Sequence, residues 1–193
     1  WSPAAGLSNA AISNPNASPA VTTTYVVTVT DGCSPAVQDS VTITVLPLPV
    51  VLFSGDILSG CSPVCVTFTD ASTVAGGTIA TWNWSFGDGT PNDLTQNPPT
   101  HCYTNTGTSD ATFTVGLTVT SSLGGCVSTD TYLNYITVYA NPIAEFTASP
   151  NPANILEPTV NFTDQSTSTS PITSWSWDFA DGTANSSLTN PTH

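Results

Sequence analysis

The sequence predicts an all-β protein made of two-sheet sandwich domains in tandem. Short runs such as 24–30 and 112–120 alternate apolar, mostly β-branched residues with threonine, which is typical of half-buried strands. Helix-favouring residues are scarce, since the chain has no Met, Lys or Arg and is rich in threonine. Turn signals such as Asp31-Gly32 and Asp88-Gly89 separate the runs.

The strands can be placed in order along the chain. Gly76-Gly77, Gly124-Gly125 and the proline-containing segments 47–49 and 141–142 interrupt them as turns or linkers. Roughly seven strands per domain of this size fit a two-sheet sandwich. The clearest expected strands are Thr24–Thr30, Ser40–Val45, Val64–Thr69, Thr112–Thr120 and Tyr135–Tyr139.

One aromatic motif occurs twice, at Trp82–Thr90 and at Trp175–Thr183, 93 positions apart. A fixed offset that long indicates a repeat whose period is one whole domain. The repeat predicts three segments: residues 1–47 as the C-terminal half of a domain, 48–140 as a complete domain, and 141–193 as an N-terminal half. The same offset relates Phe53 to Phe146, Cys33 to Cys126, and Ile43-Thr44-Val45 to Ile136-Thr137-Val138.

Short linkers that contain proline restrict bending, so the repeats are expected to form a rod-like array. We expect the chain to be an excerpt from a longer series of domains. The alternative is a short subunit whose half-domains are completed by strands from neighbouring subunits.

The charge of the chain restricts its partners. It carries 13 acidic residues and no Lys or Arg, for a formal net charge of −13. This excludes nucleic acid as a partner and disfavours an anionic membrane surface. No stretch reaches the roughly 20 apolar residues of a membrane helix. The five cysteines, an odd count in turn-rich contexts, favour an oxidising extracellular compartment.

The repeated motif has structural roles that require no catalysis. Because Trp82, Trp84 and Phe86 alternate along a strand, they share one face; Trp84 and Phe86 are expected in the core, and Trp82 partly exposed. The alternative for Trp82 is a sugar-stacking platform. Asp88-Gly89 is expected to form a tight turn in which the carboxylate accepts backbone N–H groups. The second copy comprises Trp175, Trp177, Phe179, Asp181 and Gly182.

His101 and His193 end equivalent Asn-Pro segments, which favours a structural corner over a proton shuttle. No nucleophile motif accompanies either histidine, so the chain is predicted not to be an enzyme and to need no cofactor. Tyr103 is expected to act as a tyrosine corner, with its hydroxyl bonded back to the backbone.

Some of these residues are of types that bind zinc or calcium. Zinc at Cys61, Cys65, His101 and Cys102 lacks a recognised spacing, and a disulfide explains the same cysteines. Calcium is attracted by acidic surfaces without cations, but neither an EF-hand nor an Asp-x-Asp-x-Asp run is present. The candidate calcium ligands, chosen by location, are Asp56, Asp88, Asp93 and Glu145.

Residues 52–140 resemble a PKD domain throughout. The resemblance is carried by Trp84-Ser-Phe86-Gly-Asp88-Gly89, by Asn97-Pro-Pro-Thr-His101-Cys-Tyr103, and by the strand Phe113–Val119. Residues 146–193 match the same pattern, with Ala180 in place of the motif glycine. Two stretches, Trp1–Ser8 and Thr22–Thr30, resemble a related immunoglobulin-like repeat of Bacteroidetes surface proteins.

The resemblance implies an immunoglobulin-like sandwich used as a spacer or interaction module. The mixture of repeats is similar to the giant gliding-motility adhesins of Bacteroidetes, which are exported by type IX secretion and displayed on the outer membrane. Its expected partners are neighbouring repeats and an extracellular polysaccharide or other surface ligand. The alternatives are accessory domains of a secreted polysaccharidase or protease, and a surface-fibre subunit completed by strand exchange.

The sandwich also suggests disulfide pairings. Cys65–Cys102 is the first choice because both cysteines lie at one end of the sandwich, and Cys61–Cys102 is the second. Cys33, Cys61 and Cys126 are expected to find partners across domain junctions. Ser40, in Asp39-Ser40-Val41, is a candidate site for an O-linked glycan of the Bacteroidetes type.

Overall fold

The computed structural model describes all 193 residues, and every regular element in it is a strand. No helix long and apolar enough to cross a lipid bilayer is present. The strands are β1 (Thr23–Val29), β2 (Val37–Ile43), β3 (Phe53–Gly55), β4 (Ser59–Cys61), β5 (Val64–Val66), β6 (Phe68–Asp70), β7 (Ile79–Ser85), β8 (His101–Tyr103), β9 (Ala111–Ser121), β10 (Val127–Tyr139), β11 (Phe146–Ser149) and β12 (Asn161–Asp164).

The chain forms two compact units. The first comprises Trp1–Leu52, Ala71–Asn83 and Thr118–Asp130. The second comprises Phe53–Asp70, Trp84–Leu117 and Thr131–His193. The all-β prediction is confirmed, and most strands fall where the alternation predicts them.

One predicted strand is divided. The run Val64–Thr69 becomes β5 and β6, because β5 pairs with β8 whereas β6 pairs with β3. Thr67 lies between them, and its N–H donates to the Asp56 carboxylate at 2.8 Å. The Thr67 carbonyl accepts from the Asp56 N–H at 3.2 Å. Asp56 therefore satisfies the backbone at the point where the strand changes partner.

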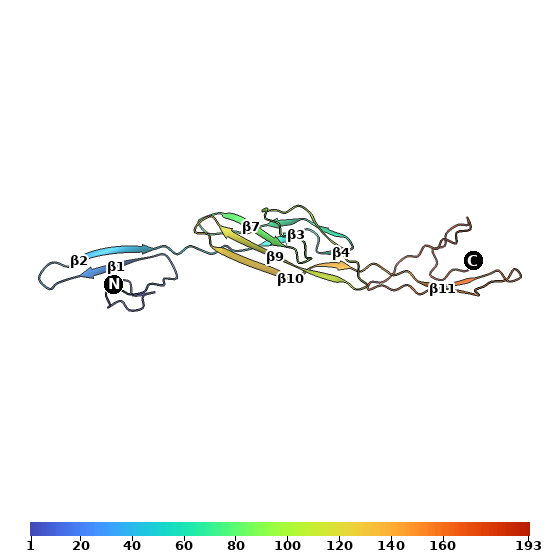
Figure 1. Cartoon of the computed structure of the whole chain (residues 1–193), viewed down its shortest axis with the longest axis horizontal. Helices are drawn as coiled ribbons and strands as arrows, with labels where there is room; N and C mark the ends of the chain where they lie inside the picture. Colours follow the sequence, from blue (N-terminus) through green and yellow to red (C-terminus); the bar gives the residue numbers. More distant parts are fainter. The chain divides into compact units, whose positions relative to one another are not determined.

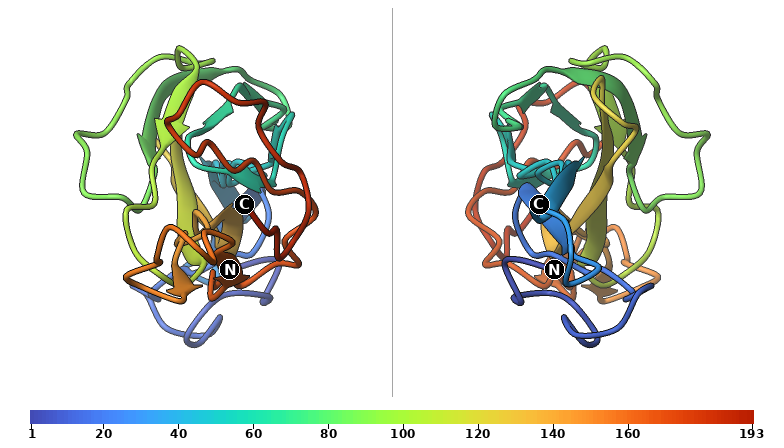
Figure 2. Two further views of the ribbon diagram at one scale, coloured as in Figure 1. Left: turned by 90° about the vertical axis from the view of Figure 1, so that its right-hand side faces the viewer. Right: turned by 90° about the vertical axis from the view of Figure 1, so that its left-hand side faces the viewer.

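The central β-sheet contains four strands in the order β4-β10-β9-β7, and its long strands β9 and β10 lie side by side (Figure 1). Strand β4 pairs with β10 in parallel, with Thr137 opposite Ser59. The short antiparallel pairs β3–β6 and β5–β8 form the opposing layer, seen across from the long strands in Figure 2. This is a β-sandwich.

The core of the second unit contains a group of aromatic and a group of aliphatic side chains. Phe68, Trp84 and Tyr103 are fully buried, and Phe53 is 3% exposed. The aliphatic side chains come from alternate positions of β9 and β10, which is the expected pattern for strands with one buried face. They are Val115, Leu117, Ile136 and Val138.

Strands β1 and β2 form an antiparallel hairpin in the first unit, with Tyr25 opposite Val41 and Val29 opposite Val37. Directly opposed residues in an antiparallel pair point to the same side. One face of the hairpin is therefore mainly apolar. The other face is mainly polar and includes a hydrogen bond between the Thr24 and Thr42 hydroxyls at 2.8 Å.

Candidate functional site

The repeated motif builds a tight turn at Asp88–Thr90. The Thr90 N–H and hydroxyl both donate to Asp88 Oδ1, at 3.1 and 2.5 Å. Gly89 adopts a φ of +83°, which favours glycine. The same turn recurs at Asp181–Thr183, where the Thr183 N–H and hydroxyl donate to Asp181 Oδ1 at 3.0 and 2.6 Å.

The second oxygen of each aspartate contacts a histidine. Nε2 of His101 lies 2.7 Å from Asp88 Oδ2, and Nε2 of His193 lies 2.7 Å from Asp181 Oδ2. An ionised carboxylate can only accept hydrogen bonds, so Nε2 carries the proton in each pair. This pairing was not predicted from the sequence, although these are the only two histidines in a chain without Lys or Arg.

Each imidazole also stacks on a phenylalanine of the motif. The ring centroids of Phe86 and His101 are 3.9 Å apart with an interplanar angle of 11°. For Phe179 and His193 the corresponding values are 4.0 Å and 2°. The chain thus builds one Asp–His–Phe cluster twice.

The contacts at each cluster lower the pKa of its aspartate. Burial alone would raise the pKa of Asp88, but hydrogen bonds from the Thr90 hydroxyl, the His101 ring and the Thr90 N–H outweigh it. The Thr183 hydroxyl and the His193 ring hold the pKa of Asp181 well below its ordinary value. Both carboxylates are therefore ionised acceptors, which suits fixing a turn rather than transferring a proton.

Neither histidine is hydrogen-bonded to a serine, threonine or cysteine side chain, so neither cluster extends to a nucleophile. Each imidazole is held on one side by the carboxylate and on one face by a phenylalanine. The geometry ties a loop to the core at each histidine.

The expectation for Tyr103 was wrong. Its hydroxyl is buried but has no hydrogen-bond partner. The ring packs instead between His101 and Phe113, with both centroid distances at 4.8 Å. Burial, and then the negative charge of Asp88, raises the pKa of Tyr103 well above its ordinary value. A hydroxyl that bonds back to the backbone does occur at Tyr25, which donates to the Ala5 carbonyl at 2.8 Å.

The disulfide between Cys65 and Cys102 is present, as predicted. The two residues are directly opposed in the β5–β8 pair, with their Cα atoms 3.9 Å apart. A link across 37 positions stabilises the fold by about 4 kcal/mol in the chain-entropy model. Cys33, Cys61 and Cys126 form no disulfide within this chain. Their pairing across domain junctions stays a prediction.

The two tryptophans of each motif differ in environment. Trp84 is fully buried, and its indole N–H donates to the Thr95 carbonyl at 3.0 Å. Its counterpart Trp177 makes the same bond to the Leu188 carbonyl at 2.8 Å but is only half-buried. Trp82 is half-buried on β7, and Trp175 donates from its indole to Asp164 Oδ2 at 3.0 Å.

The candidate calcium ligands do not gather into one site. Asp56 is bonded to Thr67, Asp88 to Thr90 and His101, and Asp93 to Thr95. No group of three or more His, Cys, Asp or Glu side chains is placed to hold a metal ion. The glycan candidate Ser40 lies exposed on β2.

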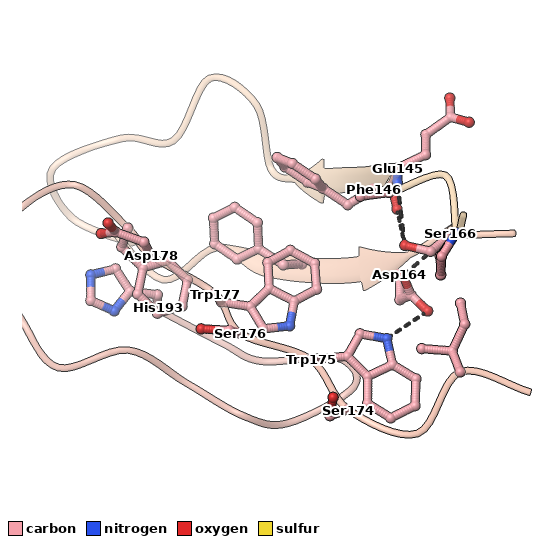
Figure 3. A pocket seen from close by; sticks show the side chains of 15 residues that line it. Glu145, Phe146, Asp164, Ser166, Ser174, Trp175, Ser176, Trp177, Asp178 and His193 are labelled. Carbon is pink, nitrogen blue, oxygen red and sulfur yellow. Dashed lines mark hydrogen bonds between the residues drawn. The ribbon is translucent and has the colours of Figure 1, made fainter. Parts of the chain in front are cut away.

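A groove of about 550 Å³ opens on residues 142–193. Figure 3 shows Phe146 on β11 and Trp177 on the facing segment pointing toward one another, with Trp175 bonded to Asp164 at the rim. The rings of Phe146 and Trp177 meet edge to face at 5.3 Å. Phe146 is 56% exposed, whereas its counterpart Phe53 is 3% exposed. The groove is therefore the uncovered counterpart of the core around Phe53.

The middle of the chain is similar to a known protein family. The family model described as "PKD domain" matches residues 49–138. The similarity to this family therefore covers a little under half of the chain. No curated protein matches the chain.

Among solved structures, the chain is similar to the PKD1 domain of Epp from Vibrio anguillarum. The identity is 24% and the TM-score 0.37, over 48% of this chain and 98% of that one. It is also similar to the PKD1 domain of the metalloprotease PrtV from Vibrio cholerae, at 24% identity and a TM-score of 0.37, over 47% of this chain and 96% of that one.

Proposed function

We propose that this chain is a non-catalytic extracellular repeat segment, a stalk or filament, of a large bacterial cell-surface adhesin. It serves surface attachment and gliding, with its sandwich domains in a tandem rod-like array. Its partners are neighbouring repeats and a surface ligand such as a polysaccharide. The PKD match at residues 49–138 supports a spacer role.

The observation that carries this proposal is the duplicated Asp–His–Phe cluster. A catalytic residue occurs once per site and is aimed at a substrate, whereas each histidine here is tied to its own aspartate and phenylalanine. Repetition of a structural cluster once per domain is typical of a tandem array of domains, such as a stalk that holds another part of the protein away from the cell. The disulfide between β5 and β8 supports an oxidising compartment outside the cell.

The test is the intact mass of the source polypeptide, combined with labelling of unpermeabilised cells by an antibody raised against residues 1–193. An adhesin stalk gives a very large polypeptide with further repeats, no catalytic domain, and a labelled cell surface. A catalytic domain in the same polypeptide would overturn the proposal in favour of a spacer in a secreted polysaccharidase or protease. Labelling only after permeabilisation would overturn the extracellular location.

A further inference from the structure

The connection that follows the β1–β2 hairpin is short and is tied at both ends. At the hairpin end, the Val45 N–H donates to the Thr22 hydroxyl at 3.0 Å, and that hydroxyl lies 3.3 Å from the Val45 carbonyl, to which it donates. At the other end, Val50 exchanges two backbone hydrogen bonds with Thr73, at 2.7 and 2.9 Å. Only residues 46–49 lie between these two attachments.

The four residues of this connection are themselves restricted. Pro47 and Pro49 have fixed φ angles, and Pro49 is buried. Leu46 is half-buried, whereas Leu48, two positions further on, is 65% exposed. Leu46 therefore makes a packing contact that Leu48 does not make.

Leu46 packs on Gly124, in the loop between β9 and β10. A Cβ built on Gly124 would lie 2.1 Å from Leu46 Cδ1 and 3.6 Å from Leu46 Cγ, so the leucine fills the space that a side chain would need. A Cβ on the adjacent Gly125 would meet nothing. All three residues belong to the first compact unit. Glycine at position 124 thus permits a close approach of the leucine to the backbone of the loop.

Hydrogen bonds hold this loop in shape. Ser121 is 3% exposed, its N–H donates to the Cys126 carbonyl at 2.9 Å, and the Cys126 N–H donates to Ser121 Oγ at 3.1 Å. The Ser122 N–H donates to the Thr78 carbonyl at 2.8 Å, which ties the loop to the residue before β7. The loop therefore gives Leu46 a well-defined surface to pack against.

The next linker, at residues 141–142, is also tied where it begins. Asp110 Oδ1 accepts the Ala140 N–H at 3.0 Å and the Thr169 hydroxyl at 2.7 Å. These three residues lie in the second compact unit. A tie at the start of a linker therefore occurs twice, with an apolar contact at the first linker and hydrogen bonds at the second.

We propose that Leu46 and the loop of residues 121–126 form a clasp, in which the linker leucine packs on Gly124 and holds the β1–β2 hairpin in one arrangement relative to that loop. Burial of the aliphatic side chain supplies the attraction. The short linker with two prolines keeps Leu46 near Gly124, so little conformational entropy is lost when the contact forms. The clasp deepens the proposed rod-like array and rests on that proposal for its purpose, because a stalk of fixed length needs junctions that do not bend.

The test measures the distance between two nitroxide labels in the 193-residue protein by double electron–electron resonance. The labels are attached without reductant to Cys33, in the turn between β1 and β2, and to Cys61 on β4. A Cys126→Ser background removes the third free thiol and keeps the Cys65–Cys102 disulfide. The expected result for this reference protein is one narrow distance distribution. A broad distribution would show a hinged junction and overturn the proposal.

Two variants remove the clasp, and each has a neighbouring control. Leu46→Ala removes the packed side chain, whereas Leu48→Ala removes the exposed leucine of the same linker. Gly124→Ala displaces the leucine, whereas Gly125→Ala adds the same methyl group without a contact. The two glycines have φ angles of +69° and +65°, so the backbone strain is matched. Leu46→Ala and Gly124→Ala should broaden the distribution, and both controls should leave it narrow.

The double variant tests whether the two residues act through their mutual contact. If they do, Leu46→Ala combined with Gly124→Ala broadens the distribution no more than either change alone. Additive broadening, equal effects of a variant and its control, or a narrow distribution in every variant overturns the clasp. None of these outcomes decides the proposed function, since the intact mass and the surface labelling would still identify a stalk whose junctions are hinged.

Discussion

His101 Nε2 lies 2.7 Å from the Asp88 carboxylate while the His101 ring stacks on Phe86 at 3.9 Å. The hydrogen bond and the stack come from one side chain, and they join the Asp88 turn to strand β8. Because the chain has no Lys or Arg, histidine is the only basic side chain available for this contact. The arrangement recurs at His193, so the contact belongs to the repeat rather than to one loop.

Asp88→Asn should lower the free energy of unfolding of residues 49–138 by about 1 kcal/mol, since it replaces a charge-assisted hydrogen bond with a neutral one. Asp93→Asn is the matched control. Asp93 accepts the Thr95 N–H and hydroxyl as Asp88 accepts those of Thr90, but it has no histidine. Denaturant unfolding measures both. Equal losses in the two variants would show that His101 contributes nothing.

The stability of residues 49–138 should fall in acid. Hydrogen bonds to Asp88 lower its pKa in the folded state below the ordinary 3.8. A lowered carboxyl pKa contributes stability that is fully present above the unfolded pKa and is lost as pH falls through the folded pKa. Unfolding curves should therefore shift to lower denaturant as pH drops below about 4. In Asp88→Asn this part of the slope should vanish; an unchanged slope would refute the assignment.

Tyr103→Phe should stabilise the protein, which is the reverse of the loss that a tyrosine corner would give. The hydroxyl is buried without a partner, and an unsatisfied buried polar group costs about 1 kcal/mol or more. The raised pKa of Tyr103 adds a second effect: the free energy of unfolding falls further as pH rises above the unfolded pKa near 10, because only the unfolded state loses the proton readily. Unfolding at neutral and alkaline pH measures both effects, and Tyr25→Phe, which removes a real hydrogen bond, is the contrasting control.

The sequence predicted what depends on local alternation and spacing. The strands β1, β9 and β10 follow from alternating residues, and the disulfide follows from two cysteines at one end of a sandwich. The division of Val64–Thr69 was not predictable in this way, because it depends on Asp56, eleven positions away, satisfying the Thr67 backbone.

The histidine clusters lay beyond sequence reasoning for a similar reason. Asp88 and His101 are 13 positions apart, and Asp181 and His193 are 12 apart, so only the fold brings each pair together. A signal was nonetheless present: each histidine follows a repeated Asp-Gly-Thr turn at nearly the same distance. The predicted hydrogen bond from the Tyr103 hydroxyl to the backbone was wrong, because the position of a tyrosine in the motif does not reveal which acceptor lies near its hydroxyl.

The two glycines of the Phe86–Gly89 segment should respond differently to alanine. Both have positive φ, but a Cβ on Gly87 would lie 2.2 Å from the Thr114 carbonyl oxygen, whereas one on Gly89 meets nothing. Gly89→Ala should therefore cost about 1 kcal/mol of backbone strain. Gly87→Ala should cost about 3 kcal/mol, because strain and overlap add.

In the second copy of the motif, Ala180 stands at the position of Gly87. Ala180 adopts a φ of +60°. Ala180→Gly should relieve strain and stabilise residues 141–193 by at most about 1 kcal/mol. The net gain is smaller, because glycine also raises the conformational entropy of the unfolded chain. Hydrogen exchange of the β9 and β12 amides reports the two regions separately. If the Gly87→Ala and Gly89→Ala variants show the same hydrogen-exchange rates in β9, the close approach of Thr114 is not what requires glycine at position 87.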